Sequence, residues 1–333
     1  MRAILHIGTE KTGTTSFQEF CHKNRKLLLE QKVLYPTNLG VRNHRELAIY
    51  ALDLANDDDG LRHLRLKSED DLQEFRDGVQ RKLEMQVSQA SNADVCIISS
   101  EHFHSRLEQP HEIERVKVLL DPLFDEIEVH LHLRPQIDVV VSLASTQTRV
   151  GGAVRRSFFD RPKPTQLYFN YNLLVKAWED VFSASNVHLL AFRKTSNFLG
   201  FIESHLSLDF GNMPVPSRVN EAIDVRVMAM VNALVDSGSQ QRIDHRVIDL
   251  LPVVEKVRPD LKMAKAVQDR FTRSNQELVA RRMDLYDGDL MPSWDSYSET
   301  GNLDYLDMPC AFSRPLADLI TYYNTIITHE KAK

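Results

Sequence analysis

A short stretch near the start of the chain, residues 8–16 with the sequence GTEKTGTTS, combines glycines, hydroxyl side chains and a lysine. It follows the apolar run Ala3–Ile7, which is typical of a buried strand, and precedes a helical pattern from Phe17 onward. The bracketing glycines favour a tight turn whose backbone N–H groups face one anion, and the helix N-terminus adds positive dipole charge. Lys11 supplies one full positive charge. The stretch therefore predicts a phosphate-binding turn, although a plain strand-to-helix connection would contain the same elements.

The position of the lysine distinguishes this turn from a P-loop, whose pattern is G-x-x-x-x-G-K-[ST]. Here Thr14 follows the second glycine, and Lys11 lies inside the turn. The block resembles the 5′-phosphosulfate-binding loop of sulfotransferases that use 3′-phosphoadenosine 5′-phosphosulfate (PAPS). The resemblance implies that the donor is bound by Glu10, Lys11, Thr12, Gly13, Thr14, Thr15 and Ser16.

A second motif begins at residue 134, where the predicted strand 127–133 ends in Arg134 and Pro135. In sulfotransferases, an arginine at a strand end and a serine about eight residues later hold the 3′-phosphate of the nucleotide. Arg134 and Ser142 stand at that separation, and a guanidinium forks onto phosphate oxygens while a serine hydroxyl donates beside it. A structural strand stop with a surface arginine is the alternative for Arg134.

The resemblance covers most of residues 3–210 by the order of its elements. It includes a helix at 171–182, with tyrosine and tryptophan in a Tyr-x6-Trp pattern, and a final strand at 187–192. Two further stretches, residues 218–221 and 271–275, resemble segments of some bacterial members of the family and receive no role here.

The chemistry that the resemblance implies is transfer of a sulfuryl group to an acceptor hydroxyl or amine, with 3′-phosphoadenosine 5′-phosphate (PAP) as product. Such a reaction needs a cation at the leaving group and a base at the acceptor. Lys11 fits the first role. His44, which follows the second predicted strand, and Glu101, which follows the third, are both candidates for the base. Simple structural roles for both, a helix start for His44 and an ion pair for Glu101, stay open.

Metal-dependent chemistry receives less support from the sequence. His130 and His132 alternate along one predicted strand, as do His102 and His104 if that segment is extended, but no third or fourth ligand is spaced to match. We therefore expect no metal site and no metal requirement.

The alternative function is that of a P-loop kinase for a small molecule, using Mg-ATP or Mg-GTP. Its magnesium ion would need an acid at the end of a buried strand. The strand to Leu133 ends in arginine, and the strand to Ser99 reaches Glu101 only after two serines. A non-catalytic nucleotide-binding or polyanion-binding module is a third class, which the presence of candidate bases disfavours.

Composition limits the partners and the location. A net charge of −6 argues against an extended nucleic-acid-binding face. Three cysteines without a C-x-x-C pattern predict neither disulfides nor a cysteine zinc site, and we expect a cytoplasmic protein without a signal peptide or membrane span. The segment 149–163 carries five basic residues and one acid, which suggests a flap near an anionic acceptor such as an acidic glycan; a solvated loop is the alternative. The oligomeric state is not predicted.

Alternating apolar strands and helices predict the fold class. We expect an α/β protein with a P-loop-like parallel sheet of about four to five strands flanked by helices, with a helical C-terminal extension. The predicted domains are a PAPS-binding core at 1–215 and a helical cap packed on it at 216–333. Ligands of such sheets bind beyond the carboxyl ends of the strands, where the residue-8 turn, Glu101 and Arg134 all fall.

Overall fold

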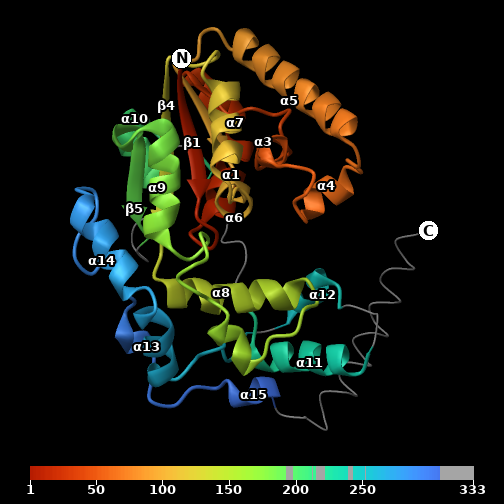
Figure 1. Cartoon of the computed structure of the whole chain (residues 1–333), viewed down its shortest axis with the longest axis vertical. Coiled ribbons are helices and arrows are strands. Elements are labelled where there is room, and N and C mark those ends of the chain that lie inside the picture. The colour runs from red at the N-terminus through yellow and green to blue at the C-terminus, as the bar shows by residue number, and fades with distance from the viewer. Residues whose placement is uncertain (193–197, 212, 215–221, 239–242, 252, 308–333) are drawn as a thin grey trace. The chain divides into compact units, whose positions relative to one another are not determined.

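The computed structural model describes residues 1–192, 198–211, 213–214, 222–238, 243–251 and 253–307 (Figure 1). The chain divides into two compact units that are interleaved along the sequence. The first unit consists of Met1–Arg134, Asn170–Val219 and Ser274–Leu290, and the second of Pro135–Phe169, Asn220–Arg273 and Met291–Lys333. The domain boundary expected at residue 215 stays a prediction, and the segment 218–221 lies outside the described residues.

The first unit is built on one parallel sheet of five strands, in the order β2-β3-β1-β4-β5. This confirms the predicted α/β class and the predicted number of strands. β1 lies at the centre of the sheet, where residues 3–7 are all fully or almost fully buried. Since all strands run the same way, the segments that follow them meet at one edge of the sheet. The strands are β1 (Arg2–Gly8), β2 (Val33–Leu34), β3 (Val95–Ser99), β4 (Glu126–Leu133) and β5 (Val187–Ala191).

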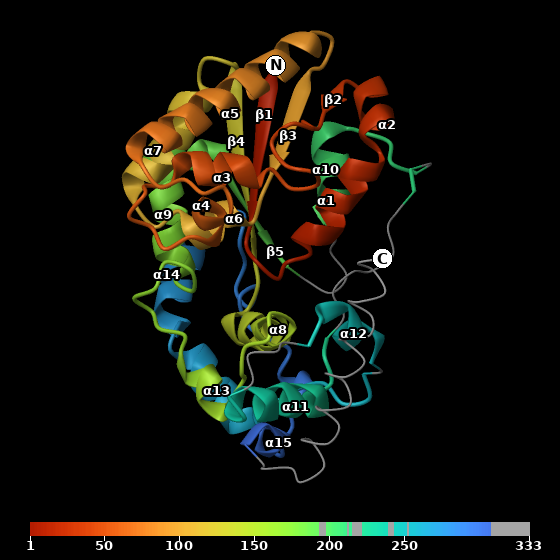
Figure 2. The same cartoon turned by 90° about the vertical axis from the view of Figure 1, so that its right-hand side faces the viewer.

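Helices cover both faces of this sheet, as Figures 1 and 2 show. One face carries α1 (Thr14–Lys23), α2 (Arg25–Glu30) and α10 (Phe198–Leu206), which share an apolar core that includes Ile4, Phe20 and Ile202. The opposite face carries α3 (Arg45–Ala51), α5 (Glu69–Gln89), α7 (Pro110–Leu120) and α9 (Tyr171–Phe182). The short helices α4 (Asp59–His63) and α6 (His102–Arg106) and most of α14 (Thr272–Arg281) complete the unit.

The start of α5 follows from its first residues. The Ser68 side chain accepts from the Asp71 backbone N–H at 3.1 Å, and the Asp71 carboxylate accepts from the Ser68 N–H at 3.0 Å. Ser68 followed by Asp71 three residues later is the sequence signature of a capping box, and the pair satisfies two backbone donors that a helix start would otherwise expose.

The second unit is helical, with α8 (Gln136–Arg149), α11 (Val225–Asp236), α12 (His245–Leu250), α13 (Leu261–Asp269) and α15 (Asp304–Asp307). Its own apolar core includes Ile137, Phe159 and Met228. The helical spacing of apolar residues over 261–286 predicts one continuous helix, but the helix is interrupted after Asp269. The interruption buries Phe271 completely and lets Arg270 donate to the carbonyl oxygens of residues 159, 160 and 162.

Within the described part of the chain, no helix combines the length and the apolar character that crossing a membrane requires.

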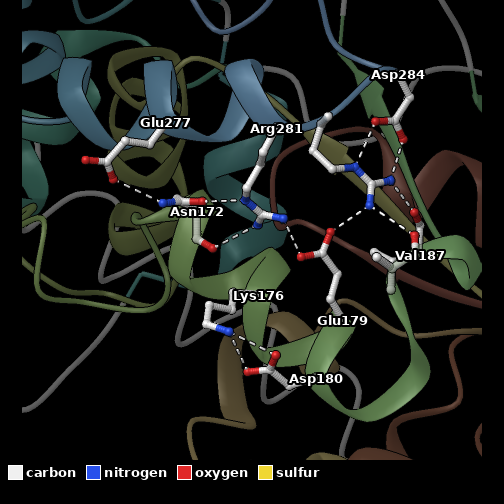
Figure 3. A network of polar contacts seen from close by, with 10 residues as sticks. Asn172, Lys176, Glu179, Asp180, Val187, Glu277, Arg281 and Asp284 are labelled. Atoms are coloured by element: carbon white, nitrogen blue, oxygen red, sulfur yellow. Dashed lines mark hydrogen bonds and ion pairs between the residues drawn. The ribbon is translucent and has the colours of Figure 1, made fainter.

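A network of ion pairs joins the segment after α14 to α9 and β5 (Figure 3). Arg282 donates to Glu179 at 2.6 Å, to Asp284 at 2.8 Å and to the carbonyl oxygen of Val187. The Arg282 and Glu179 side chains are only 10% and 8% exposed. The network therefore connects residues 274–290 to the sheet unit, although about ninety residues of sequence separate them from α9.

We expect the Arg282→Ala substitution to lower the free energy of unfolding by about 3 kcal/mol, because it leaves the buried Glu179 carboxylate with one fewer cation. The matched control is Lys176→Ala, since Lys176 pairs with Asp180 on the same helix in exposed positions. The Lys176→Ala substitution should lower the free energy of unfolding by less than about 0.5 kcal/mol. Urea unfolding of both variants provides the comparison, and equal costs would contradict a stabilising role for the Arg282 network.

Candidate active site

The loop between β1 and α1 has a backbone that only a few residue types adopt easily. Gly8, Lys11 and Gly13 have φ angles of 75°, 68° and 86°. A Cβ atom on Gly8 would lie 2.8 Å from the Thr14 side chain, so glycine is required there for space as well as for conformation. Gly13 is the N-cap of α1 and offers no side chain to cap it. The positive end of the helix dipole therefore faces the loop that precedes it.

Hydrogen bonds hold this loop against the neighbouring elements. The Thr9 N–H and hydroxyl both donate to the carbonyl oxygen of His132 on β4, at 3.2 and 2.7 Å. The Thr12 hydroxyl donates to the Thr9 carbonyl at 2.6 Å, and the Glu10 N–H donates to Nδ1 of His104 at 3.2 Å. The loop is thus fixed in shape by the protein itself, which is the preorganisation that anion binding favours.

Arg134 lies directly beside the loop. Its Nη1 donates to the carbonyl oxygen of Lys11 at 2.9 Å, and its guanidinium carbon lies 5.3 Å from the centre of the Phe192 ring. The Tyr171 hydroxyl donates to the Arg134 carbonyl at 2.6 Å and fixes the backbone at this point. The structure thus brings together two of the predicted site residues, Lys11 and Arg134, from β-strand ends that are adjacent in the sheet.

Glu101 is also close to the loop. A Cβ on Gly8 would lie 3.5 Å from the Glu101 Cβ. The Gln18 side chain on α1 donates to Oε2 of Glu101 at 2.7 Å and to the Ser99 hydroxyl at 3.2 Å. Glu101 is partly exposed and is therefore oriented by Gln18 without being removed from solvent.

His44, the other predicted base, lies in a different setting. The ring is completely buried, its Nε2 donates to the Pro36 carbonyl at 3.0 Å, and its Nδ1 accepts from the Ser99 N–H at 2.9 Å. Burial lowers the pKa of His44 to about 4. With one nitrogen donating and the other accepting, the ring links β3 to the segment 36–44, and no nitrogen lone pair faces an acceptor substrate.

The burial of His44 predicts acid sensitivity. Its folded-state pKa of about 4 is below the ordinary value near 6.5, so the unfolded chain binds this proton first as the pH falls. Stability should therefore decrease as the pH falls from about 6.5 toward 4, by about 2 kcal/mol at pH 5 for this residue.

Urea unfolding at pH 7 and pH 5 measures this effect, with His44→Gln as the test variant and the exposed His63→Gln as the control. The His44 variant should lose less stability between the two pH values than the control. An identical pH dependence in both variants would argue against a neutral buried His44.

Two more histidines lie beneath the loop. Nδ1 of His6 is 2.8 Å from the Ser99 hydroxyl, and the His6 ring is 5.2 Å from that of His132. Burial lowers the pKa of His132 to about 3 and that of His6 well below its ordinary value. Both rings are therefore neutral near pH 7. Among the residues that the structure describes around the loop, Lys11 and Arg134 supply positive charge.

Ser142 lies on α8 in the second unit, whereas Arg134 belongs to the first, so their joint action on one phosphate stays a prediction. The basic segment 149–163 is paired with acids of its own unit. Arg149 and Arg155 bond to Asp249 and Asp236, and Arg156 lies 3.4 Å from Asp260. These pairs neutralise much of the charge that suggested an anionic acceptor.

Several side chains around the loop were not identified from the sequence. Gln18 orients Glu101, His104 accepts from Glu10, and Phe192 stacks on Arg134. A polar residue at a buried position of an otherwise amphipathic helix is the signal that could have indicated Gln18. The contacts of His104 and Phe192 depend on strand order, which residue spacing does not encode.

No protein-family model matches this chain, and no curated protein gives a match. Among solved structures, the chain is similar to a crystal structure of a sulfotransferase from Alicyclobacillus acidocaldarius. The TM-score is 0.39 and the sequence identity 17%, over 71% of this chain and 91% of that chain. At this level of similarity, the function has to be argued from the residues of the site.

Proposed function

We propose that the protein transfers the sulfuryl group of PAPS to a hydroxyl or amine group of an acceptor. The observation that carries the proposal is the hydrogen bond from Arg134 to the Lys11 carbonyl, which joins a permanent cation to a preorganised anion-binding turn. Two cationic side chains from neighbouring strand ends suit a nucleotide with phosphate groups at two positions.

In this proposal the loop binds the 5′-phosphosulfate. The amides of residues 12–15 and the positive end of α1 face its phosphate, whereas the Ser16 N–H donates to the Gly13 carbonyl. Lys11 stabilises the charge that develops on the leaving group. Arg134 uses Nη1 for the loop, and its four other N–H donors suit the 3′-phosphate. Ser142 is its predicted partner there.

Glu101 is proposed as the general base. The acceptor oxygen or nitrogen attacks sulfur in line with the bridging oxygen, its proton passes to the Glu101 carboxylate, and the bond from sulfur to the bridging oxygen breaks. The electron pair of that bond remains with the 5′-phosphate of PAP, where Lys11 lies. The hydrogen bond from Gln18 supports this role because it directs one carboxylate oxygen and leaves Glu101 partly exposed.

The test is incubation of the protein with PAPS and a panel of phenols, alcohols, amines and oligosaccharides, in buffer without Mg²⁺. We expect formation of PAP in step with an acceptor that gains one sulfuryl group. Turnover of ATP or GTP that requires Mg²⁺, with PAPS left intact across the panel, would instead favour the small-molecule kinase.

A further inference from the structure

Three histidines and one glutamate gather on the sheet face that α10 covers, in a part of the first unit that the proposed reaction does not use. Glu128 and His130 are two residues apart on β4 and therefore point to the same face. His188 on β5 is the register partner of His130, and His205 comes from α10, which lies beside β5 in Figure 1. Three separate elements thus contribute to one cluster.

The donor atoms converge on a single carboxylate oxygen. Oε2 of Glu128 lies 3.0 Å from Nε2 of His130, 2.7 Å from Nε2 of His205 and 3.8 Å from Nε2 of His188. One donor atom each from Glu128, His130 and His188 fall within 4.8 Å of one another. In a tetrahedral zinc site with bonds near 2.0–2.1 Å, ligand atoms lie about 3.3 Å apart. The distances from Oε2 to the three nitrogens straddle this value. His205 stands outside the set of donor atoms that lie within 4.8 Å of one another, so an ion bound by all four residues requires the His205 ring to turn toward His130 and His188.

The surroundings also suit a bound ion. Arg2 donates to Oε1 of Glu128 at 2.9 Å, which holds the carboxylate and directs Oε2 toward the histidines. Such outer partners are typical of metal-binding carboxylates. The Glu128 and His130 side chains are 6% and 2% exposed, whereas those of His188 and His205 are 34% and 27% exposed. The cluster is therefore buried at Glu128 and His130 and accessible to solvent at His188 and His205.

We propose that Glu128, His130, His188 and His205 bind one divalent transition-metal ion, with Zn²⁺ as the best match. Imidazole nitrogens together with one carboxylate oxygen are ligands that zinc accepts, and four protein ligands make a closed site of the structural kind. The ion holds β4, β5 and α10 together. The proposal is independent of sulfuryl transfer and requires no zinc in the reaction.

The sequence did not indicate this site because its ligands come from three elements. The expectation of no metal site considered the His130 and His132 pair and found no matching third ligand. In the structure, His130 is joined instead by Glu128 from its own strand and by His188 and His205 from elements more than fifty residues away.

The experiment uses untagged full-length protein that has been stripped with a chelator and exchanged into metal-free buffer. Calorimetric titration with Zn²⁺ should give a stoichiometry of one ion per chain. Excess Zn²⁺ should raise the Tm of the protein by about 5 °C. Titration with Co²⁺ should give the intense visible absorption of a tetrahedral site. Less than one ion per chain, or Co²⁺ spectra of a six-coordinate site, would overturn the proposal.

Two variants test the ligands without disturbing the core. His188→Ala and His205→Ala change the two more exposed ligands, and each should weaken Zn²⁺ binding by more than about 100-fold, since losing an outer partner alone costs about 10–100-fold. The exposed His63→Ala is the matched control and should bind as the parent does. Circular dichroism confirms folding. Unchanged zinc affinity in both ligand variants would place the ion elsewhere and refute the site.

Discussion

Replacing Arg134 by alanine is expected to weaken PAP binding by about 100-fold. The substitution removes a guanidinium that donates to the Lys11 carbonyl and that, in our proposal, binds the 3′-phosphate. Hydrogen bonds to charged groups contribute about 1.5–3 kcal/mol each, so the loss of one or two such bonds accounts for a decrease in PAP affinity of about 100-fold. Calorimetric titration of the variant with PAP measures the change directly.

Two further substitutions make this result specific. Arg134→Lys keeps the charge but loses the fork geometry, and it should recover only part of the affinity. Arg62→Ala removes an exposed arginine of the same unit, paired with Asp57, and should bind PAP as the parent does. A folded Arg134→Ala protein with unchanged PAP affinity would contradict the assignment of Arg134 to the nucleotide.

Replacing Glu101 by glutamine is expected to lower kcat by about 1,000-fold while PAP binds as before. The amide keeps the size of the side chain but accepts no proton, and general base catalysis typically contributes about 10²–10⁴-fold. Glu101 lies beside Gly8 and is oriented by Gln18, so the change leaves the loop backbone intact. Steady-state kinetics with PAPS and the acceptor identified from the panel give the measurement.

The comparison with His44 separates the two bases that the sequence left open. His44→Gln should destabilise the protein, because the ring bonds to Pro36 and Ser99, yet the folded variant should retain most of its kcat. The opposite pattern, with an active Glu101→Gln protein and an inactive but folded His44→Gln protein, would transfer the role to His44.

The sheet could be predicted from the sequence because its strands are short apolar runs with clear ends. Residues 3–7 and 95–98 are almost entirely buried, and a strand buried on both faces needs apolar side chains throughout. The helix over 261–286 was predicted as continuous, since periodicity does not show where a helix turns to bury a side chain such as Phe271. Capping residues were more informative, as the Ser68 and Asp71 pair shows.

The loop around Lys11 could be predicted for a similar reason, because glycine positions and local spacing act within a few residues. The roles of neighbouring side chains depend on distant contacts. His44 looked like a base because it follows a strand, and only the structure shows both of its nitrogens bonded to Pro36 and Ser99. The contact between Arg134 and Lys11 likewise depends on β1 and β4 being adjacent in the sheet.

The histidine cluster shows the same dependence on long-range contacts most clearly. His188 and His205 have no distinctive local sequence, and their proximity to Glu128 arises from the pairing of β4 with β5 and the packing of α10. Binding of the proposed zinc ion would therefore require the folded sheet and the packed α10, and a protein that binds no zinc could still carry out the proposed reaction.

The most direct test of the proposed function is calorimetric titration of the parent protein with PAP in metal-free buffer and, separately, with Mg-ATP. Our account predicts micromolar binding of PAP at one site per chain and no measurable binding of Mg-ATP. Preferential binding of Mg-ATP, with no heat from PAP, would contradict it and would assign the loop of residues 8–16 to a nucleoside triphosphate.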